Sequence, residues 1–173
     1  MDRDYQAERK VVMKKRCFFF LLVLFLFLIF SPPASIHAEG QAGLSDGQTI
    51  YVPAYSHIYS GSRERPFLLT VTLSIRNIDP KNSISITAAD YYETQGRLLK
   101  KYVDRPVTLK PLESIRYIVP ENSATGGSGA NFIVEWKSGK PVNAPIVESV
   151  MIGTQGQQGI SFTSRGRIII PTE

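Results

Sequence analysis

The side chains best suited to catalysis or ligand binding lie in one short segment, residues 51–59. Three tyrosines and a histidine occupy odd-numbered positions in it: Tyr51, Tyr55, His57 and Tyr59. Side chains two residues apart on a β-strand point to the same side, so an extended segment would place all four on one face. We therefore predict an aromatic row that docks a sugar ring or a proline-rich peptide. The alternative is an edge strand whose aromatic face packs on the core.

His57 is the only histidine after residue 38, and Cys17 is the only cysteine in the chain. A zinc site usually needs three or four protein ligands, and type-one copper needs a cysteine, so we predict no metal and no cofactor. Ser56 adjoins His57, but neighbours on a strand face opposite ways. The sequence also has no Gly-x-Ser-x-Gly motif. A hydrolase using His57 is therefore a less favoured function, and no catalytic residue is predicted.

Two glycine-rich segments, residues 123–132 and 153–159, could present hydrogen-bonding groups. A phosphate-binding loop leads into a helix, whereas a strand pattern follows the first segment, so we predict a tight turn with glycines at positive φ. The second segment combines three glycines with three glutamines, whose uncharged amides suit a carbohydrate or a peptide backbone. The candidate binding residues in these segments are Ser128, Asn131, Gln157 and Gln158.

The elements that must position these residues are short β-strands. In residues 67–77 apolar and polar side chains alternate, and Phe132, Val134 and Trp136 share one face of a second run. Sustained period-two alternation predicts half-buried strands. Other short apolar runs with turn residues between them, and no helical periodicity, indicate an antiparallel β-sandwich of immunoglobulin-like or jelly-roll type.

Asp90 conflicts with this pattern. It continues the inward register of Ile84, Ile86 and Ala88, and a buried carboxylate must be paired or hydrogen-bonded. We expect either an arginine partner, such as Arg76 or Arg116, or a β-bulge near Ala89 that moves Asp90 to the surface.

The N-terminal segment is typical of a secretory signal peptide. A basic stretch, residues 1–16, precedes fourteen apolar residues at 17–30, and small residues follow up to residue 38. Fourteen helical residues reach about 21 Å, short of the roughly 30 Å hydrocarbon core. We predict a cleaved Sec-type signal helix and a periplasmic or extracellular protein. The alternative is an uncleaved signal that anchors the chain in the inner membrane.

Charge and cysteine content restrict the function of the exported part. The whole chain has a net charge of +5, but residues 39–173 hold 14 basic and 12 acidic residues with no basic stripe. Nucleic-acid binding is therefore not expected. An exported domain without cysteines must be stabilised by core burial rather than by disulfides.

Several motifs in order resemble one protein family. They are YVPAYSHIY at 51–59, LSIRN at 73–77, DYY at 90–92, GGSGANF at 126–132 and GTQGQQGISF at 153–162. Together they resemble the domain-of-unknown-function 3124 family of exported bacterial proteins, over roughly residues 50–168. The resemblance implies a bacterial envelope protein and supplies no activity, substrate or catalytic residue.

The sequence thus predicts an all-β protein, an antiparallel β-sandwich after an N-terminal signal helix. The expected organisation is a signal peptide at 1–38, a flexible leader at 39–48 and a β-sandwich domain at 49–173. The expected function is a non-catalytic binding or structural module of the bacterial envelope, whose partner is an envelope protein or a glycan. The alternative is a small-molecule or glycan-binding domain with a pocket lined by tyrosine and histidine.

Overall fold

The structure is a computed structural model that describes residues 43–59, 65–155 and 157–171. The chain divides into two compact units, residues 1–41 and 42–173, and the described residues belong to the second. The predicted signal peptide and the first part of the predicted leader lie outside the described residues.

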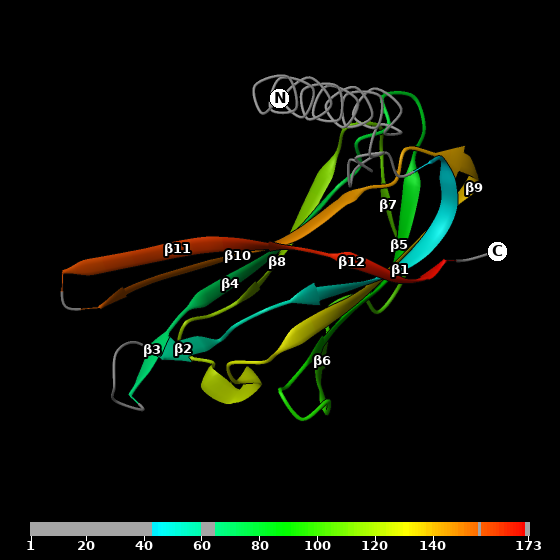
Figure 1. Ribbon diagram of the computed structural model, residues 1–173. Helices are drawn as coiled ribbons and strands as arrows, with labels where there is room; N and C mark the ends of the chain where they lie inside the picture. Colours follow the sequence, from blue (N-terminus) through cyan, green and yellow to red (C-terminus); the bar gives the residue numbers. More distant parts are fainter. Residues whose placement is uncertain (1–42, 60–64, 156, 172–173) are drawn as a thin grey trace, which may run out of the picture. The chain divides into compact units, whose positions relative to one another are not determined.

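Two antiparallel sheets pack face to face (Figure 1), which confirms the predicted β-sandwich. The larger sheet has the order β12-β1-β9-β5-β6, with β7 also paired to β5, and the smaller has the order β11-β10-β4-β8. The larger sheet contains β1 (Ser45–Pro53), β5 (Ile84–Tyr92), β6 (Leu98–Lys101), β7 (Val107–Leu109), β9 (Asn131–Val142) and β12 (Arg167–Pro171). The smaller sheet contains β4 (Thr70–Arg76), β8 (Ser114–Val119), β10 (Ile146–Gln155) and β11 (Gln158–Arg165). A separate hairpin pairs β2 (His57–Tyr59) with β3 (Pro66–Leu68), and η1 (Ala124–Gly126) is a 3-10 turn.

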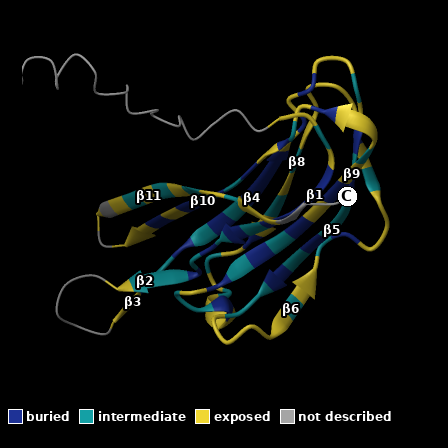
Figure 2. Cartoon of the chain, turned by 45° about the vertical axis from the view of Figure 1, so that its right-hand side comes forward, coloured by how far each residue is buried: buried dark blue, intermediate teal, exposed yellow. Residues whose placement is uncertain are grey.

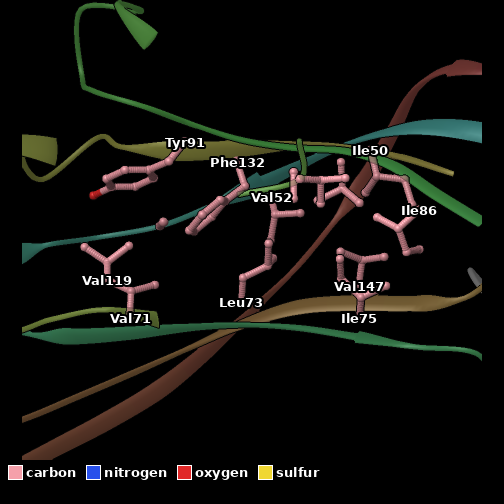
Figure 3. Packing of buried hydrophobic residues seen from close by; sticks show 14 of the residues in the cluster. Ile50, Val52, Val71, Leu73, Ile75, Ile86, Tyr91, Val119, Phe132 and Val147 are labelled. Carbon is pink, nitrogen blue, oxygen red and sulfur yellow. The ribbon is translucent and has the colours of Figure 1, made fainter. Parts of the chain in front are cut away.

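The core is the apolar layer between the sheets. Figure 3 shows Ile50, Val52 and Phe132 of the larger sheet pointing toward Val71, Leu73 and Ile75 of the smaller one. These side chains are buried, and burial alternates along the strands (Figure 2). The predicted inward faces of residues 67–77 and 131–136 are therefore confirmed. A buried side-chain contact adds to this layer, because Trp136 Nε1 donates to Gln48 Oε1 at 3.3 Å. β1 begins at Ser45, within residues 39–48, the predicted leader.

The predicted inward register of β5 is wrong beyond Ile86. The pairing of β5 with β9 shifts between Ile86 and Ala88, and such a β-bulge exchanges the inward and outward sides. Ala89 and Tyr91 are consequently buried. Asp90 lies on the outer side, 3.9 Å from Lys101 Nζ. The bulge expected near Ala89 therefore exists slightly earlier, and neither of the proposed arginines pairs with Asp90.

Two consecutive strands near the C-terminus belong to different sheets. β11 pairs with β10 in the smaller sheet, β12 pairs with β1 in the larger sheet, and only Gly166 separates them. The Gly166 amide donates to the Val147 carbonyl at 2.9 Å, and a Cβ at this position would overlap Cγ2 of Ile50. Glycine is therefore required at position 166, where the chain passes from the smaller sheet to the larger one.

A buried polar cluster joins the turns at the end of the sandwich where β4 finishes. Asn77 Nδ2 donates to the carbonyls of Asn82 and Lys110, at 2.8 and 2.9 Å. Asp79 accepts backbone N–H bonds from Lys81, Asn82 and Asn143, at 2.8 to 3.1 Å. These bonds, with those from the Asn143 side chain, lower the pKa of Asp79 from 3.8 to about 2. The cluster fixes the β4–β5, β7–β8 and β9–β10 turns together.

Replacing Gly166 tests the crossing. We expect Gly166→Ala to lower the free energy of unfolding by about 1–3 kcal/mol, because the added methyl overpacks the core against Ile50. The matched control is Gly139→Ala, where a Cβ would meet nothing within 4 Å and the change should stay within about 0.5 kcal/mol. Urea unfolding of both variants checks this, and equal effects would contradict it.

The lowered pKa of Asp79 predicts acid sensitivity. Its ionised form is favoured in the folded state, so the stabilisation is complete above pH 4 and is lost as the pH falls through 2. Asp79→Asn should lower the melting temperature at pH 7 and flatten the decline between pH 4 and 2. Thermal melts of the wild type and the variant across this range measure both effects. An unchanged slope in the variant would show that other groups cause the acid sensitivity.

Candidate functional site

Most of the predicted site residues gather at one end of the sandwich, which we name the hairpin end. It comprises the β2–β3 hairpin, the glycine-rich loop at residues 123–130 and the turn between β10 and β11. Both hairpins extend from the same side of the domain in Figures 1 and 2. The β2–β3 hairpin approaches β10 near its turn with β11, because a Cβ on Gly153 would overlap the carbonyl oxygen of Leu68.

The four aromatic positions of the predicted row lie in two strands and the chain that joins them, because β1 ends at Pro53 and β2 begins at His57. Tyr51 alternates with buried Ile50 and Val52 and therefore lies on the outer face of the larger sheet. β1 ends at Pro53, but the alternation of burial continues beyond it, with Ala54 and Ser56 buried and Tyr55 and His57 half-buried. Tyr55 is half-buried and packs edge-on against Phe162 of β11, with ring centroids 5.7 Å apart.

His57 and Tyr59 do share a face, as predicted. Their rings lie edge-to-face with centroids 5.3 Å apart, and His57 Nε2 lies 3.2 Å from the Tyr59 hydroxyl. The Tyr59 side chain is exposed, with 54% of its residue surface accessible. No serine or carboxylate of the described residues hydrogen-bonds to His57. The pair is thus an oriented aromatic surface without the contacts of a catalytic triad.

The glycine-rich loop is fixed by two hydroxyl groups. Ser56 Oγ accepts from the Gly127 amide at 2.8 Å and lies 3.1 Å from the Gly127 carbonyl oxygen. Thr94 Oγ1 donates to the Gly126 carbonyl and accepts from the Gly129 amide, both at 3.0 Å. Gly127 has φ 84°, where glycine is favoured. The predicted tight turn is present, with positive φ at this one of its described glycines.

The four polar candidates occupy two separate places. Ser128 is half-buried within the glycine-rich loop. Asn131 is the first residue of β9 and pairs with Pro53 and Tyr92. Gln157 is exposed with φ 69° in the turn between β10 and β11, and Gln158 begins β11 opposite Gln155. Ser128 and Asn131 therefore adjoin the chain that precedes β2, whereas the glutamines lie at the tip of the other hairpin.

An aromatic cluster behind the hairpin end was not predicted. Tyr91 and Tyr102 both pack against Phe132, with centroids 4.8 and 6.0 Å away. Tyr102 also donates its hydroxyl proton to the Ile118 carbonyl of the opposite sheet at 3.0 Å. Burial raises the pKa of Tyr91 to about 12, so this tyrosine stays neutral at physiological pH. Through Tyr102 the cluster connects the chain after β6 with β8 of the smaller sheet.

The described ranges contain no group of three or more His, Cys, Asp or Glu side chains arranged to hold a metal ion. In the same ranges no helix is long and apolar enough to cross a bilayer. The fold and the site thus define an antiparallel β-sandwich that carries aromatic and amide side chains on the hairpins and loops at one end.

Residues 47–169 match the family model described as "Protein of unknown function (DUF3124)". The chain therefore belongs to this family. No curated protein matches it. Among solved structures, "Crystal Structure of Thermotoga maritima 1070" is similar, with 12% identity and a TM-score of 0.42, covering 76% of this chain and 100% of that chain.

Removing the Ser56 hydroxyl tests the loop clamp. Ser56→Ala should lower the free energy of unfolding by about 1 kcal/mol, because the Gly127 amide loses its hydrogen bond to Ser56 Oγ. The matched control is Ser123→Ala, whose hydroxyl contacts only the exposed Thr125 hydroxyl at 3.4 Å and which should change stability by at most about 0.5 kcal/mol. Urea unfolding and amide exchange at Gly127 measure the difference. Unchanged exchange at Gly127 in Ser56→Ala would refute the clamp.

Proposed function

We propose that this protein is an exported module of the bacterial envelope that binds a partner protein through its hairpin end. The export pattern at residues 1–38 supports the location. The signal segment is either removed or retained as an inner-membrane anchor. In this proposal the sandwich is a non-catalytic scaffold.

The exposed Tyr59 beside His57 is the observation that carries the binding proposal. A tyrosine supplies a large, amphipathic contact area at low entropic cost, and such residues often dominate interfaces. His57 restricts the ring through an edge contact and a hydrogen bond. The nearby glycine-rich loop is already fixed by Ser56 and Thr94. Binding at such a preorganised surface loses less conformational entropy than binding at a loose one.

A glycan is the second candidate ligand, and the same pair favours it. The accessible tyrosine ring offers an apolar face for a sugar ring, and Ser128 in the glycine-rich loop and Gln157 in the β10–β11 turn offer uncharged hydrogen-bonding groups at the same end of the domain. Tyr55 does not join this surface, because its ring packs on Phe162.

Site-specific photo-crosslinking in intact cells tests the proposal. A photoreactive amino acid replaces Tyr59 in one strain and Glu135, an exposed residue of β9, in the control strain. We expect a discrete adduct from position 59 and none from position 135. Mass spectrometry of the adduct identifies the partner and the mature N-terminus. Soluble envelope glycans that suppress the adduct would favour the glycan alternative. A chain that remains in the cytosol with residues 1–38 attached would refute export.

A pair of tyrosine variants separates binding from folding. Tyr59→Ala should reduce partner capture by at least about tenfold, the size expected for losing an interface anchor, and leave the melting temperature nearly unchanged. Tyr55→Ala should instead lower the melting temperature, because it removes the contact with Phe162. Equal capture by Tyr59→Ala and the wild type would contradict the proposed surface.

A further inference from the structure

β11 forms one edge of the smaller sheet, and Figure 2 shows it at the margin of that sheet. Among the described residues its backbone pairs with β10 alone, and this pairing has no register shift over its whole length. The one bond that a described side chain makes to this backbone comes from Ser149, which is also part of β10. Alternate N–H and C=O groups of β11 therefore point away from β10, where they can pair with another strand.

The other edge strands of the two sheets carry features that prevent association. β7 has three residues and β12 has five, β6 ends in two lysines, and β8 has an arginine at its third position. Short length, charged side chains, prolines and bulges are the usual protection of a sheet edge. The eight residues of β11 include no proline, and their one charge is at the last position, Arg165. β11 is therefore the least protected edge of the described sandwich.

The inner face of β11 leaves part of the core uncovered. Ile160 and Phe162 are half-buried and pack against the core, whereas Ser161 and Thr163 on the outer face are exposed. A strand added beside β11 would lie next to Ile160 and Phe162 and would cover their remaining apolar surface. Removal of that surface from water favours association.

The order of residues in β11 suits pairing with a second copy of the same strand. Residues directly opposite each other in antiparallel strands share a face and interact. A two-fold axis at Ser161 places Ile160 of each copy opposite Phe162 of the other, and an isoleucine beside an aromatic ring is a favourable cross-strand pair. An axis at Phe162 would instead place each Ile160 opposite Ser164. The first register therefore buries more apolar surface.

Charge does not oppose this pairing. With the axis at Ser161, the two copies of Arg165 lie about 27 Å apart along the strands, which exceeds the Debye length of about 8 Å at physiological ionic strength. Within its own chain Arg165 pairs with Glu148 of β10. β11 contains no carboxylate. The strand thus has no charge that repels its own copy and no charge pattern that selects an oppositely charged partner.

We propose that two copies of this protein associate through β11, in antiparallel register about a two-fold axis at Ser161. The two smaller sheets then continue into one. Such a symmetric, self-complementary interface is the commonest kind in homodimers. One strand pair buries a small area, so the dimer is weak and reversible. This inference does not depend on the binding proposed for the hairpin end, because it involves neither His57 nor Tyr59.

Disulfide trapping in the full chain tests both the dimer and its register. Ser161→Cys is introduced in a Cys17→Ser background, and the protein is purified in mild detergent and oxidised with copper phenanthroline. Opposed residues of paired strands have Cα atoms about 4.5–5.5 Å apart, a distance that a disulfide bridges, so we expect a covalent dimer. The matched control is Thr163→Cys, which is exposed on the same face. Its two copies would lie about 14 Å apart and should give little dimer.

Four results would contradict the proposal. No covalent dimer from Ser161→Cys would overturn it, and equal yields from Ser161→Cys and Thr163→Cys would show random collision. A dimer that forms only when the two variants are mixed would place the axis at Phe162 and overturn the register. Slow hydrogen exchange of the β11 amides that is independent of protein concentration would show that another segment of the same chain covers the edge.

A charge placed on the axis separates association from folding. Ser161→Lys brings two like charges face to face in the dimer, which is strongly unfavourable. We expect the dissociation constant of the dimer to rise by at least about tenfold in analytical ultracentrifugation. The melting temperature should stay unchanged, because Ser161 is exposed. The matched control is Ser114→Lys, at an exposed position of the edge strand β8, which should leave the dimer unchanged. Equal dissociation constants for Ser161→Lys and the wild type would overturn the interface.

Discussion

The apolar layer between the two sheets is the contact on which the rest of this protein depends. β4 and β9 each place alternate side chains in it, and the layer reaches zero exposure at residues such as Leu73 and Phe132. The described residues include no cysteine, so this layer and the strand ladders hold the domain together. Gly166 lets the chain pass from β11 of the smaller sheet to β12 of the larger sheet while it contacts Ile50 closely. A loss of packing at the crossing would therefore affect the pairing of β10 and of β1.

Both ends of the sandwich are fixed by polar side chains that bond to backbone groups. Ser56 and Thr94 hold the glycine-rich loop at one end, whereas Asn77 and Asp79 hold three turns at the other. Buried polar groups are costly unless they are hydrogen-bonded, and here the bonds also define the loop shapes. The side chains left free at each end are consequently presented on rigid supports. Rigid support makes an exposed tyrosine a better contact, because less order is lost on binding.

The strands could be predicted from the sequence because each buries one face, which imposes period-two alternation on residues 67–77 and 131–136. The period fails where backbone geometry interrupts it. The bulge before Ala88 exchanges the sides of β5, and the only local sign of it was Asp90 at an inward position, which left an arginine partner as the other alternative. β1 ends at Pro53 and β2 begins at His57, so Tyr51 and the His57–Tyr59 pair lie in different strands. In the sequence, Ser56 is notable only as a neighbour of His57. Its bonds to the glycine-rich loop join residues 71 positions apart, and sequence alone does not reveal such contacts.

Gly127 and Leu112 show two ways in which this chain meets a left-handed backbone position. Both residues adopt positive φ, at 84° and 61°. At position 127 the chain uses the residue that this geometry favours, and hydrogen bonds around it stabilise the loop. At position 112 it uses a leucine whose side chain makes little use of the core, since it is the most exposed large apolar residue described.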